Sequence, residues 1–181
     1  MIPKKIHYCW FGKGKKSKLA LKCIRSWRQY CPEYEVIEWN EENFDIDMNG
    51  YTRMCYAEKK YAYLSDYVRL WVVEKYGGIY FDTDVEVIRS LEELLRNDAF
   101  FCFENKQYVA SGLGFGSVAH GKVIQAMLKE YEILLDGKNG VRMCPKLNTQ
   151  ALVALGLKQN GRKQNVCEAV IYPMDVLNPY N

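Results

Sequence analysis

Apolar and polar residues alternate along this chain with two periods, one helical and one extended. Apolar side chains three or four positions apart predict helices that pack one face on a core. These helices are expected over residues 17–30, 51–60, 62–76, 122–135 and 148–155, with a shorter one after Ser90. Short apolar runs bounded by glycine or proline predict strands over residues 2–11, 34–39, 79–81, 99–104 and 166–172.

The order of these elements predicts the fold class. The opening strand, helix and strand follow one another directly, which favours parallel strands joined by a right-handed crossover. The run over 99–104 is apolar on both faces and is therefore expected in the middle of the sheet. We expect an α/β fold, with a mainly parallel, Rossmann-like sheet flanked by helices, and a single domain over residues 1–181.

The most informative stretch is acidic and follows a glycine pair. Gly77-Gly78 ends the helix over 62–76, a short apolar strand follows, and carboxylates then occupy every second position, at Asp82, Asp84 and Glu86. Alternate side chains of an extended chain share a face, where three like charges repel one another unless a cation lies between them. Mg²⁺ or Mn²⁺ bound to a diphosphate takes one or two such carboxylates. This predicts a metal-diphosphate site, and an acidic turn after a strand is the alternative.

The helix before this stretch carries charge in an unusual setting. It is apolar nearly all round and is therefore expected to be buried, with Asp66 and Arg69 held partly out of water. A buried pair of this kind is costly unless further partners satisfy it, whereas an exposed pair three residues apart contributes a few tenths of a kcal/mol. Because the helix leads through the glycines into the acidic strand, we expect both charge groups in one compact unit.

An aromatic residue ends the first predicted strand. Trp10 lies just before Gly12, at the edge of the sheet where open α/β folds bind ligands. Its indole can stack on a flat base there, and ordinary core packing is the alternative.

Composition and charge narrow the classes of protein. Hydrophobic residues make up 49%, which excludes a disordered chain, and the net charge of +3 gives no reason to expect nucleic acid. Basic residues gather only near Lys13 to Lys18, where we expect a solvated loop, with phosphates or an anionic membrane surface as the alternatives. Oligomeric state is left open by these features.

The spacing of the cysteines and the lengths of the apolar runs predict where in the cell the protein is located. None of the seven cysteines forms a CxxC pair, which suits reduced thiols in a cytoplasmic protein. The chain has no secretory apolar region and no apolar run of about 18 residues, so we expect a soluble protein whose membrane contact is peripheral.

Four segments together resemble a known family. They are residues 6–12 (IHYCWFG), 65–69 (SDYVR), 77–84 (GGIYFDTD) and, most weakly, Tyr172-Pro173. The combination resembles the DXD-containing sugar-binding glycosyltransferases, which include yeast initiating α-1,6-mannosyltransferases and bacterial capsular polysaccharide transferases. Catalytic domains of clostridial glucosylating toxins are more distant relatives. The resemblance extends from Ile2 to about Pro179.

The resemblance implies a GT-A fold, a Mn²⁺ or Mg²⁺ cofactor and a nucleotide-sugar donor such as a UDP-sugar or GDP-mannose. The implied reaction transfers a hexose or N-acetylhexosamine with retention to a carbohydrate or lipid-linked acceptor. Bacterial surface polysaccharide synthesis at the inner face of the membrane is the implied setting. For retention, front-face attack is expected over a covalent intermediate, for which Glu104 is a weak candidate.

The family's residue roles transfer to matching positions. Asp84 would bind the metal directly, and Asp82 would reach the metal and the ribose, while Trp10 would stack on the base. On the helix, Asp66 and Arg69 would hydrogen-bond the donor sugar. Two further residues are implied in donor binding, Ser65 beside the helix pair and Tyr80 lining the pocket.

One departure leaves alternatives open. Family members usually continue into a segment with His and Trp that closes over the diphosphate, whereas this chain has only His7 and His120 and stops at Asn181. Either the sequence is truncated at its C-terminus or the natural protein is short. A non-catalytic nucleotide-sugar-binding domain is therefore one rival. A DxD phosphatase of the haloacid-dehalogenase type is a second rival, although the motif of that class has Thr or Val where this chain has Glu86.

Overall fold

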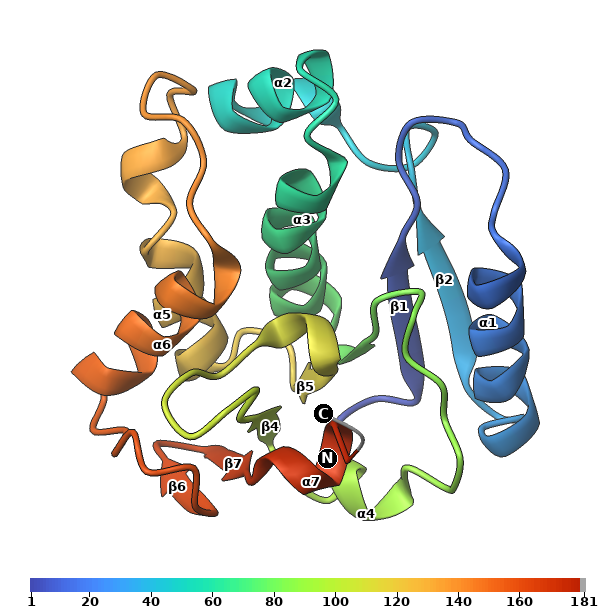
Figure 1. Ribbon diagram of the computed structural model, residues 1–181, viewed down its shortest axis with the longest axis vertical. Helices are drawn as coiled ribbons and strands as arrows, with labels where there is room; N and C mark the ends of the chain where they lie inside the picture. Colours follow the sequence, from blue (N-terminus) through green and yellow to red (C-terminus); the bar gives the residue numbers. More distant parts are fainter. Residues whose placement is uncertain (180–181) are drawn as a thin grey trace.

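The computed structural model describes residues 1–179, which form one seven-stranded sheet in the order β2-β1-β3-β5-β4-β7-β6 (Figure 1). The strands are β1 Lys5–Cys9, β2 Glu35–Trp39, β3 Gly78–Tyr80, β4 Ala99–Cys102, β5 Phe115–Ser117, β6 Gln164–Val166 and β7 Ala169–Tyr172. The α-helices are α1 Lys18–Tyr30, α2 Gly50–Ala57, α3 Tyr61–Tyr76, α4 Glu92–Leu95, α5 Lys122–Lys129, α6 Cys144–Ala154 and α7 Met174–Leu177. Single 3₁₀ turns occupy Ile46–Met48, Ser111–Leu113 and Glu132–Leu134.

The predicted α/β fold is confirmed, and the sheet is mixed rather than mainly parallel. The pairs β1–β2, β1–β3 and β4–β7 are parallel, and the other three pairs are antiparallel. The single strand expected over 166–172 is a hairpin, β6–β7, whose turn at Cys167 has φ +50°. A hairpin needs only a few connecting residues, whereas a parallel crossover needs about a dozen, so short connections favour the mixed sheet.

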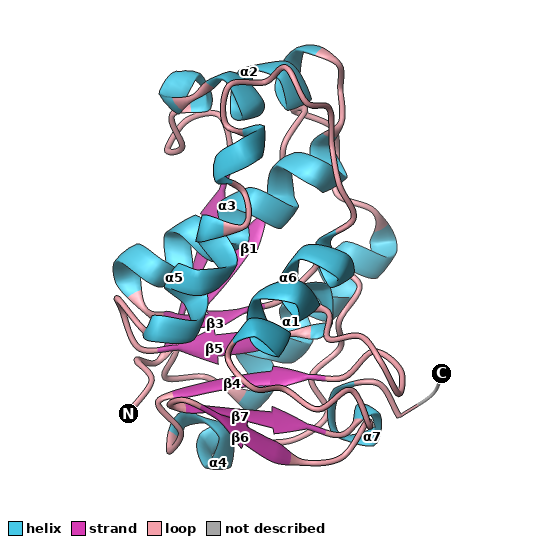
Figure 2. Ribbon diagram, turned by 90° about the vertical axis from the view of Figure 1, so that its left-hand side faces the viewer, coloured by secondary structure: helices cyan, strands magenta, loops and turns pink. Residues whose placement is uncertain are grey.

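Two hydrophobic cores lie on opposite faces of the sheet. One buries residues of α2, α3, α5 and α6, and the other buries residues of α1 and the α4 region. Neighbouring residues of β4 divide between them, because Phe100 belongs to the α1 side and Phe101 to the α3 side. Figure 2 shows β3, β5, β4, β7 and β6 stacked in sequence, with α2 at the far end of the molecule.

A glycine pair turns the chain from α3 into β3. Gly77 has φ +68° and donates its N–H to Val73 O at 2.8 Å, which closes the helix, and Gly78 has φ +119°. A Cβ at Gly78 would lie 2.8 Å from the carbonyl oxygen of Lys5 in β1, so a side chain is excluded there. The expected helix end is confirmed, and the glycine pair fixes α3 directly beside the strand that precedes the acidic residues.

Among residues 1–179, no helix combines the length and apolar character needed to span a bilayer.

Candidate active site

The acidic stretch forms a turn. β3 ends at Tyr80, and the Val85 N–H donates to the Asp82 carbonyl oxygen at 3.1 Å. The prediction that Asp82, Asp84 and Glu86 share one extended face is therefore wrong. Pairing with β5 stops at Tyr80 and the last backbone bond to β1 is made by the Phe81 N–H, so the residues from Asp82 on are free to turn, which relieves the like-charge repulsion. Glu86 lies apart from the pair and reaches the Lys22 ammonium at 3.5 Å.

Arg69 joins α3 to this turn. Its Nη2 lies 2.8 Å from Asp66 Oδ1 and 3.0 Å from Asp82 Oδ1, and the side chain is only 4% exposed. The remaining donors are used within the protein as well, since Nε donates to Ser65 O at 3.2 Å and Nη1 to Ser111 Oγ at 3.4 Å. The predicted proximity of the helix pair to the acidic stretch is confirmed, and the buried guanidinium has the partners it requires.

Two further residues hold the Asp82 carboxylate. Tyr80 donates its hydroxyl to Asp82 Oδ1 at 3.0 Å, while the Arg69 guanidinium stacks 4.9 Å above the Tyr80 ring. On the other side, a Cβ at Gly112 would lie 2.6 Å from Asp82 Oδ2. Tyr80 is buried one layer below the cavity rather than lining it, so it supports Asp82 from beneath.

The electrostatics of the cluster favour a cation. Burial raises the pKa of Asp66 to about 6, with Arg69 opposing the shift and Asp82 adding to it. Burial also raises the pKa of Asp84, and the neighbouring charge of Asp82 raises it further. Asp66, Asp82 and Asp84 share one guanidinium, which contacts only the first two, so within the described residues the cluster keeps an excess of negative charge.

The residues present fit a Mg²⁺ or Mn²⁺ ion that shares its coordination with a diphosphate. Asp82 Oδ1 is occupied by Arg69 and Tyr80, which leaves Oδ2 as the free oxygen of that carboxylate. Asp84 is exposed beside it. Within the described residues, no group of three or more His, Cys, Asp or Glu side chains could hold a metal, so protein atoms would supply only part of the coordination.

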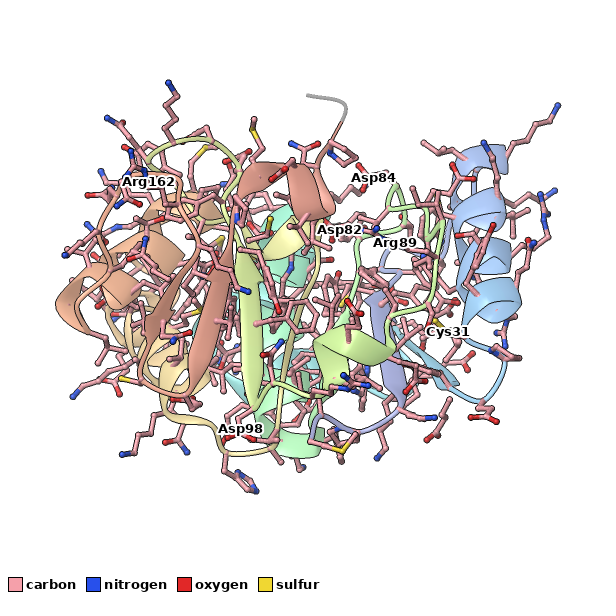
Figure 3. The ribbon with its side chains drawn as sticks, turned by 90° about the horizontal axis from the view of Figure 1, so that it is seen from below. Cys31, Asp82, Asp84, Arg89, Asp98 and Arg162 are labelled. Carbon is pink, nitrogen blue, oxygen red and sulfur yellow. The ribbon has the colours of Figure 1, made fainter. Side chains whose placement is uncertain are left out.

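These residues open onto a cavity of about 1500 Å³. Asp66, Arg69, Asp82 and Asp84 line it at one end, and Glu104 also reaches its wall. The segment after the turn, residues 85–94, and residues 175–179 around α7 complete the lining. Figure 3 shows Asp82 and Asp84 on the segment that lies between α7 and α1. A cavity of this size can hold a nucleotide sugar together with part of an acceptor.

Besides Tyr80, two predicted residues lie outside the cavity lining, Trp10 and Ser65. The Trp10 indole donates its N–H to Gly14 O at 2.8 Å, and the Lys16 ammonium lies 5.7 Å from its ring centroid. The ring is half-buried against the α1-side core and does not line the cavity near the carboxylates. Ser65 contributes its backbone carbonyl to Arg69, and its role beside the sugar remains a prediction.

Sequence reasoning missed a polar network behind Arg69. Ser111 Oγ lies 3.0 Å from Cys144 Sγ, which in turn donates to Asn148 Oδ1 at 3.0 Å. Cys144 lines the cavity from the first residue of α6, which begins four residues before the predicted start at Asn148. Pro145 was the available signal, because proline favours the first turn of a helix.

The sequence matches a known family over nearly half its length. Residues 17–101 match the family described as "Glycosyltransferase sugar-binding region containing DXD motif". Inositol phosphoceramide mannosyltransferase 3 of Schizosaccharomyces pombe is 32% identical over 106 residues, which cover 55% of this chain. The matched part spans only 29% of that relative's length.

Two solved structures share the fold. One is the PaToxG glycosyltransferase, with a TM-score of 0.69 and 19% identity, over 84% of this chain and 69% of that one. The other is the UDP-bound glycosyltransferase domain of the YGT toxin, with a TM-score of 0.56 and 11% identity, over 87% and 68% of the two chains. These likenesses confirm the expected GT-A-like fold.

Proposed function

We propose that the chain is a member of the glycosyltransferase family whose sugar-binding region contains a DXD motif, and that it transfers a sugar from a nucleoside diphosphate to an acceptor. The observation that carries the proposal is the buried Arg69, which ties the helix aspartate and the first aspartate of the motif together at the end of one cavity. We further propose that residues 1–181 act as one catalytic domain.

The first element of the mechanism is the cation. Asp84, with Oδ2 of Asp82, would hold Mn²⁺ or Mg²⁺, and the ion would neutralise charge on the departing diphosphate. The protein's contribution is to hold these two carboxylates in place. Arg69 and Tyr80 both donate to Asp82 Oδ1, which fixes the position of that carboxylate.

The second element is the orientation of the sugar. Asp66 lines the cavity and pairs with Arg69 through Oδ1, so its other oxygen is available to a sugar hydroxyl. Most Arg69 donors bind protein groups, which makes Arg69 chiefly a positioning residue in this scheme. Fixing the hydroxyls orients the anomeric carbon toward the acceptor, and such positioning lowers the barrier without any covalent step.

The finer features of the reaction rest on analogy. The UDP bound to one structural neighbour supports a UDP-sugar donor, with GDP-mannose as the other candidate. The mannosyltransferase relative, named for a ceramide lipid, supports a lipid-linked or glycan acceptor. We propose transfer with retention, by front-face attack, in bacterial surface polysaccharide synthesis at the inner face of the membrane. Trp10 as the base-stacking residue remains part of this proposal.

A panel of nucleotide sugars tests the function. UDP-glucose, UDP-N-acetylglucosamine and GDP-mannose are each added with and without Mn²⁺, and both thermal stability and donor hydrolysis are measured. A donor at 100 times its Kd stabilises the fold by about 2.7 kcal/mol, which raises the Tm by roughly 5 to 10 °C in a chain of this size. Stabilisation together with hydrolysis by one donor is expected.

The same panel separates the rival function. A donor that raises the Tm with no hydrolysis or transfer would assign the chain to non-catalytic binding. No stabilisation by any nucleotide sugar with Mn²⁺ would contradict the proposal altogether. Asp98→Asn is a suitable control variant, because Asp98 is an exposed carboxylate outside the residues that line the cavity.

A further inference from the structure

The outer face of α1 and the loop before it form a strongly basic surface. Residues 13–28 contain seven basic residues and no acidic one: Lys13, Lys15, Lys16, Lys18, Lys22, Arg25 and Arg28. The inner face of α1 is buried through residues such as Ile24 and Trp27, so the charged side chains project outward. The expected solvated loop holds only part of this charge, because four of the seven residues lie on the helix itself.

Most of this charge is unneutralised. Lys16 pairs with Glu38 and Lys22 with Glu86, and no salt bridge involves the other five basic residues within the part of the chain that the structure describes. Outside the segment the balance reverses, because the remaining 18 basic residues face 22 acidic ones. The protein is therefore polarised, with its excess positive charge concentrated on α1 and the loop before it.

Exposed leucines accompany the charge. Lys18, Lys22 and Arg25 follow one another at helical spacing along the middle of the outer face. Leu19 and Leu21 lie on either side of this stripe and are 54% and 44% exposed. A polyanion in water gains nothing from exposed leucines, whereas a lipid interface binds basic and apolar groups side by side.

The helix that carries the basic residues adjoins the wall of the cavity through its inner face. The Trp27 indole donates to Val85 O at 2.8 Å, and the Val87 N–H donates to Ser26 Oγ at 2.9 Å. Residues 85–94 line the cavity, so α1 is packed directly against the segment that bounds it. Figure 3 shows α1 beside the segment that carries Asp84 and Arg89.

We propose that residues 13–17 and the outer face of α1, the basic face, dock on an anionic membrane surface. Each basic residue near such a surface contributes about 1 kcal/mol, so five unpaired charges suffice for reversible, salt-dependent attachment. The flanking leucines add contact with the lipid interface. Docking in this way would hold the cavity beside the membrane, within reach of a lipid-linked acceptor. The docking itself does not depend on the proposed function.

Vesicle co-sedimentation tests the proposal. The protein is mixed with phosphatidylcholine vesicles and with vesicles containing about 30% phosphatidylglycerol at about 0.1 M salt. We expect binding to the anionic vesicles, at least tenfold weaker binding to neutral ones, and release at about 0.5 M salt. Removing three charges with Lys15→Gln, Lys18→Gln and Arg25→Gln together is expected to weaken anionic binding by about 30-fold or more.

A matched variant controls for net charge. Lys138→Gln, Lys158→Gln and Arg162→Gln remove three exposed charges elsewhere, and binding is expected within about twofold of the parent. The pair Leu19→Ser and Leu21→Ser is expected to weaken binding severalfold while leaving the Tm unchanged. All positions are exposed, so each variant is expected to fold, and the Tm of each verifies this.

Several outcomes would overturn the proposal. Equal losses in the two triple variants would show a net-charge effect without a defined surface. Undiminished binding of the basic-face variant would also overturn it. Tighter binding to heparin or duplex DNA than to anionic vesicles, unaffected by the leucine changes, would assign the surface to soluble polyanions. Because vesicle binding needs no donor, none of these results bears on sugar transfer.

Discussion

Arg69 Nη2 lies 3.0 Å from Asp82 Oδ1 and 2.8 Å from Asp66 Oδ1, so a single buried guanidinium bridges a helix and the turn after the neighbouring strand. The bridge reduces repulsion between two carboxylates that both lie at the end of the cavity. Without it, each carboxylate would be partly buried beside a like charge. Arg69 is therefore expected to support the fold as well as the site.

Replacing Arg69 tests this dual role. Arg69→Met leaves Asp66 and Asp82 without their shared cation, and we expect a loss of about 3 to 5 kcal/mol in unfolding free energy at pH 7.5. Urea denaturation measures the loss, which should shrink at pH 5.5 as Asp66 takes up a proton. Arg162→Met, at an exposed position, should change stability by less than about 0.5 kcal/mol. Equal stabilities for the two variants would show that the bridge does not support the fold.

Asp66 is expected to destabilise the ligand-free fold while it contributes to donor binding. Its pKa is raised by burial to about 6, from 3.8 in the unfolded chain, so the folded state binds more protons between these values. The contribution of Asp66 to the free energy of unfolding therefore falls as pH rises from about 4 to 6. Above pH 6 the full destabilisation by Asp66 is present. Asp66→Asn is expected to stabilise the ligand-free protein by about 1 to 3 kcal/mol at pH 7.5 and to weaken donor binding.

Denaturation of Asp66→Asn and the parent at pH 4.5, 6 and 7.5 measures that difference. The stabilisation should be smallest at pH 4.5 and should level off above pH 6. A constant difference across all three values would show that Asp66 does not titrate in this range.

Local periodicity made much of the fold predictable. The continuous apolar character of residues 62–76 predicted a buried helix, and α3 buries seven of its residues. The first helix was predicted from residue 17, and the Ser17 side chain caps α1 by accepting from the Ala20 N–H. The glycine pair marked the end of α3, because only residues without a Cβ fit positive φ at such close approach.

The rest depended on contacts between distant segments. The alternation of carboxylates predicted an extended run, but the length of β3 is set by its pairing with β5, which no local pattern specifies. Likewise the Ser111, Cys144 and Asn148 network joins residues more than thirty positions apart. Gly112 approaches Asp82 closely, and no local pattern in the sequence names that partner.

Gly112 provides a test that leaves both carboxylates intact. A Cβ there would lie 2.6 Å from Asp82 Oδ2 and 3.0 Å from Arg69 Nη1, so Gly112→Ala should displace Asp82. We expect Mn²⁺ affinity in the presence of UDP to fall by about 10- to 100-fold, as for other residues that orient metal ligands. Electron paramagnetic resonance of free Mn²⁺ measures it. Gly14→Ala, with open space around its Cα, should match the parent; equal affinities for both variants would exclude close packing on Asp82.

His7 should limit stability in acid. Trp39 Nε1 can only donate and Gly77 O can only accept, so His7 accepts through Nδ1 at 3.0 Å and donates through Nε2 at 2.8 Å. The ring is therefore neutral, and burial lowers its pKa below 6.5. Because the unfolded state then binds more protons, the stabilisation contributed by neutral His7 is fully present above about pH 6.5. It is lost as pH falls below that value.

The opposing titration of Asp66 must be removed to see this effect. In an Asp66→Asn background, unfolding free energy should fall by up to about 1.4 kcal/mol per pH unit below pH 6.5. Adding His7→Gln should flatten the profile, whereas His120→Gln, at an exposed histidine, should not. An unchanged slope with His7→Gln would contradict the assignment to His7.

The central claim is that the DXD carboxylates hold a cation which in turn holds a nucleoside diphosphate. Calorimetric titration of UDP into the protein, with and without Mn²⁺, tests it most directly in the parent, in Asp84→Asn and in the control Asp98→Asn. We predict that Mn²⁺ tightens UDP binding at least tenfold in the parent and in the control, and that Asp84→Asn abolishes this gain. An Asp84→Asn protein that binds UDP with the parent's affinity and the parent's dependence on Mn²⁺ would contradict it.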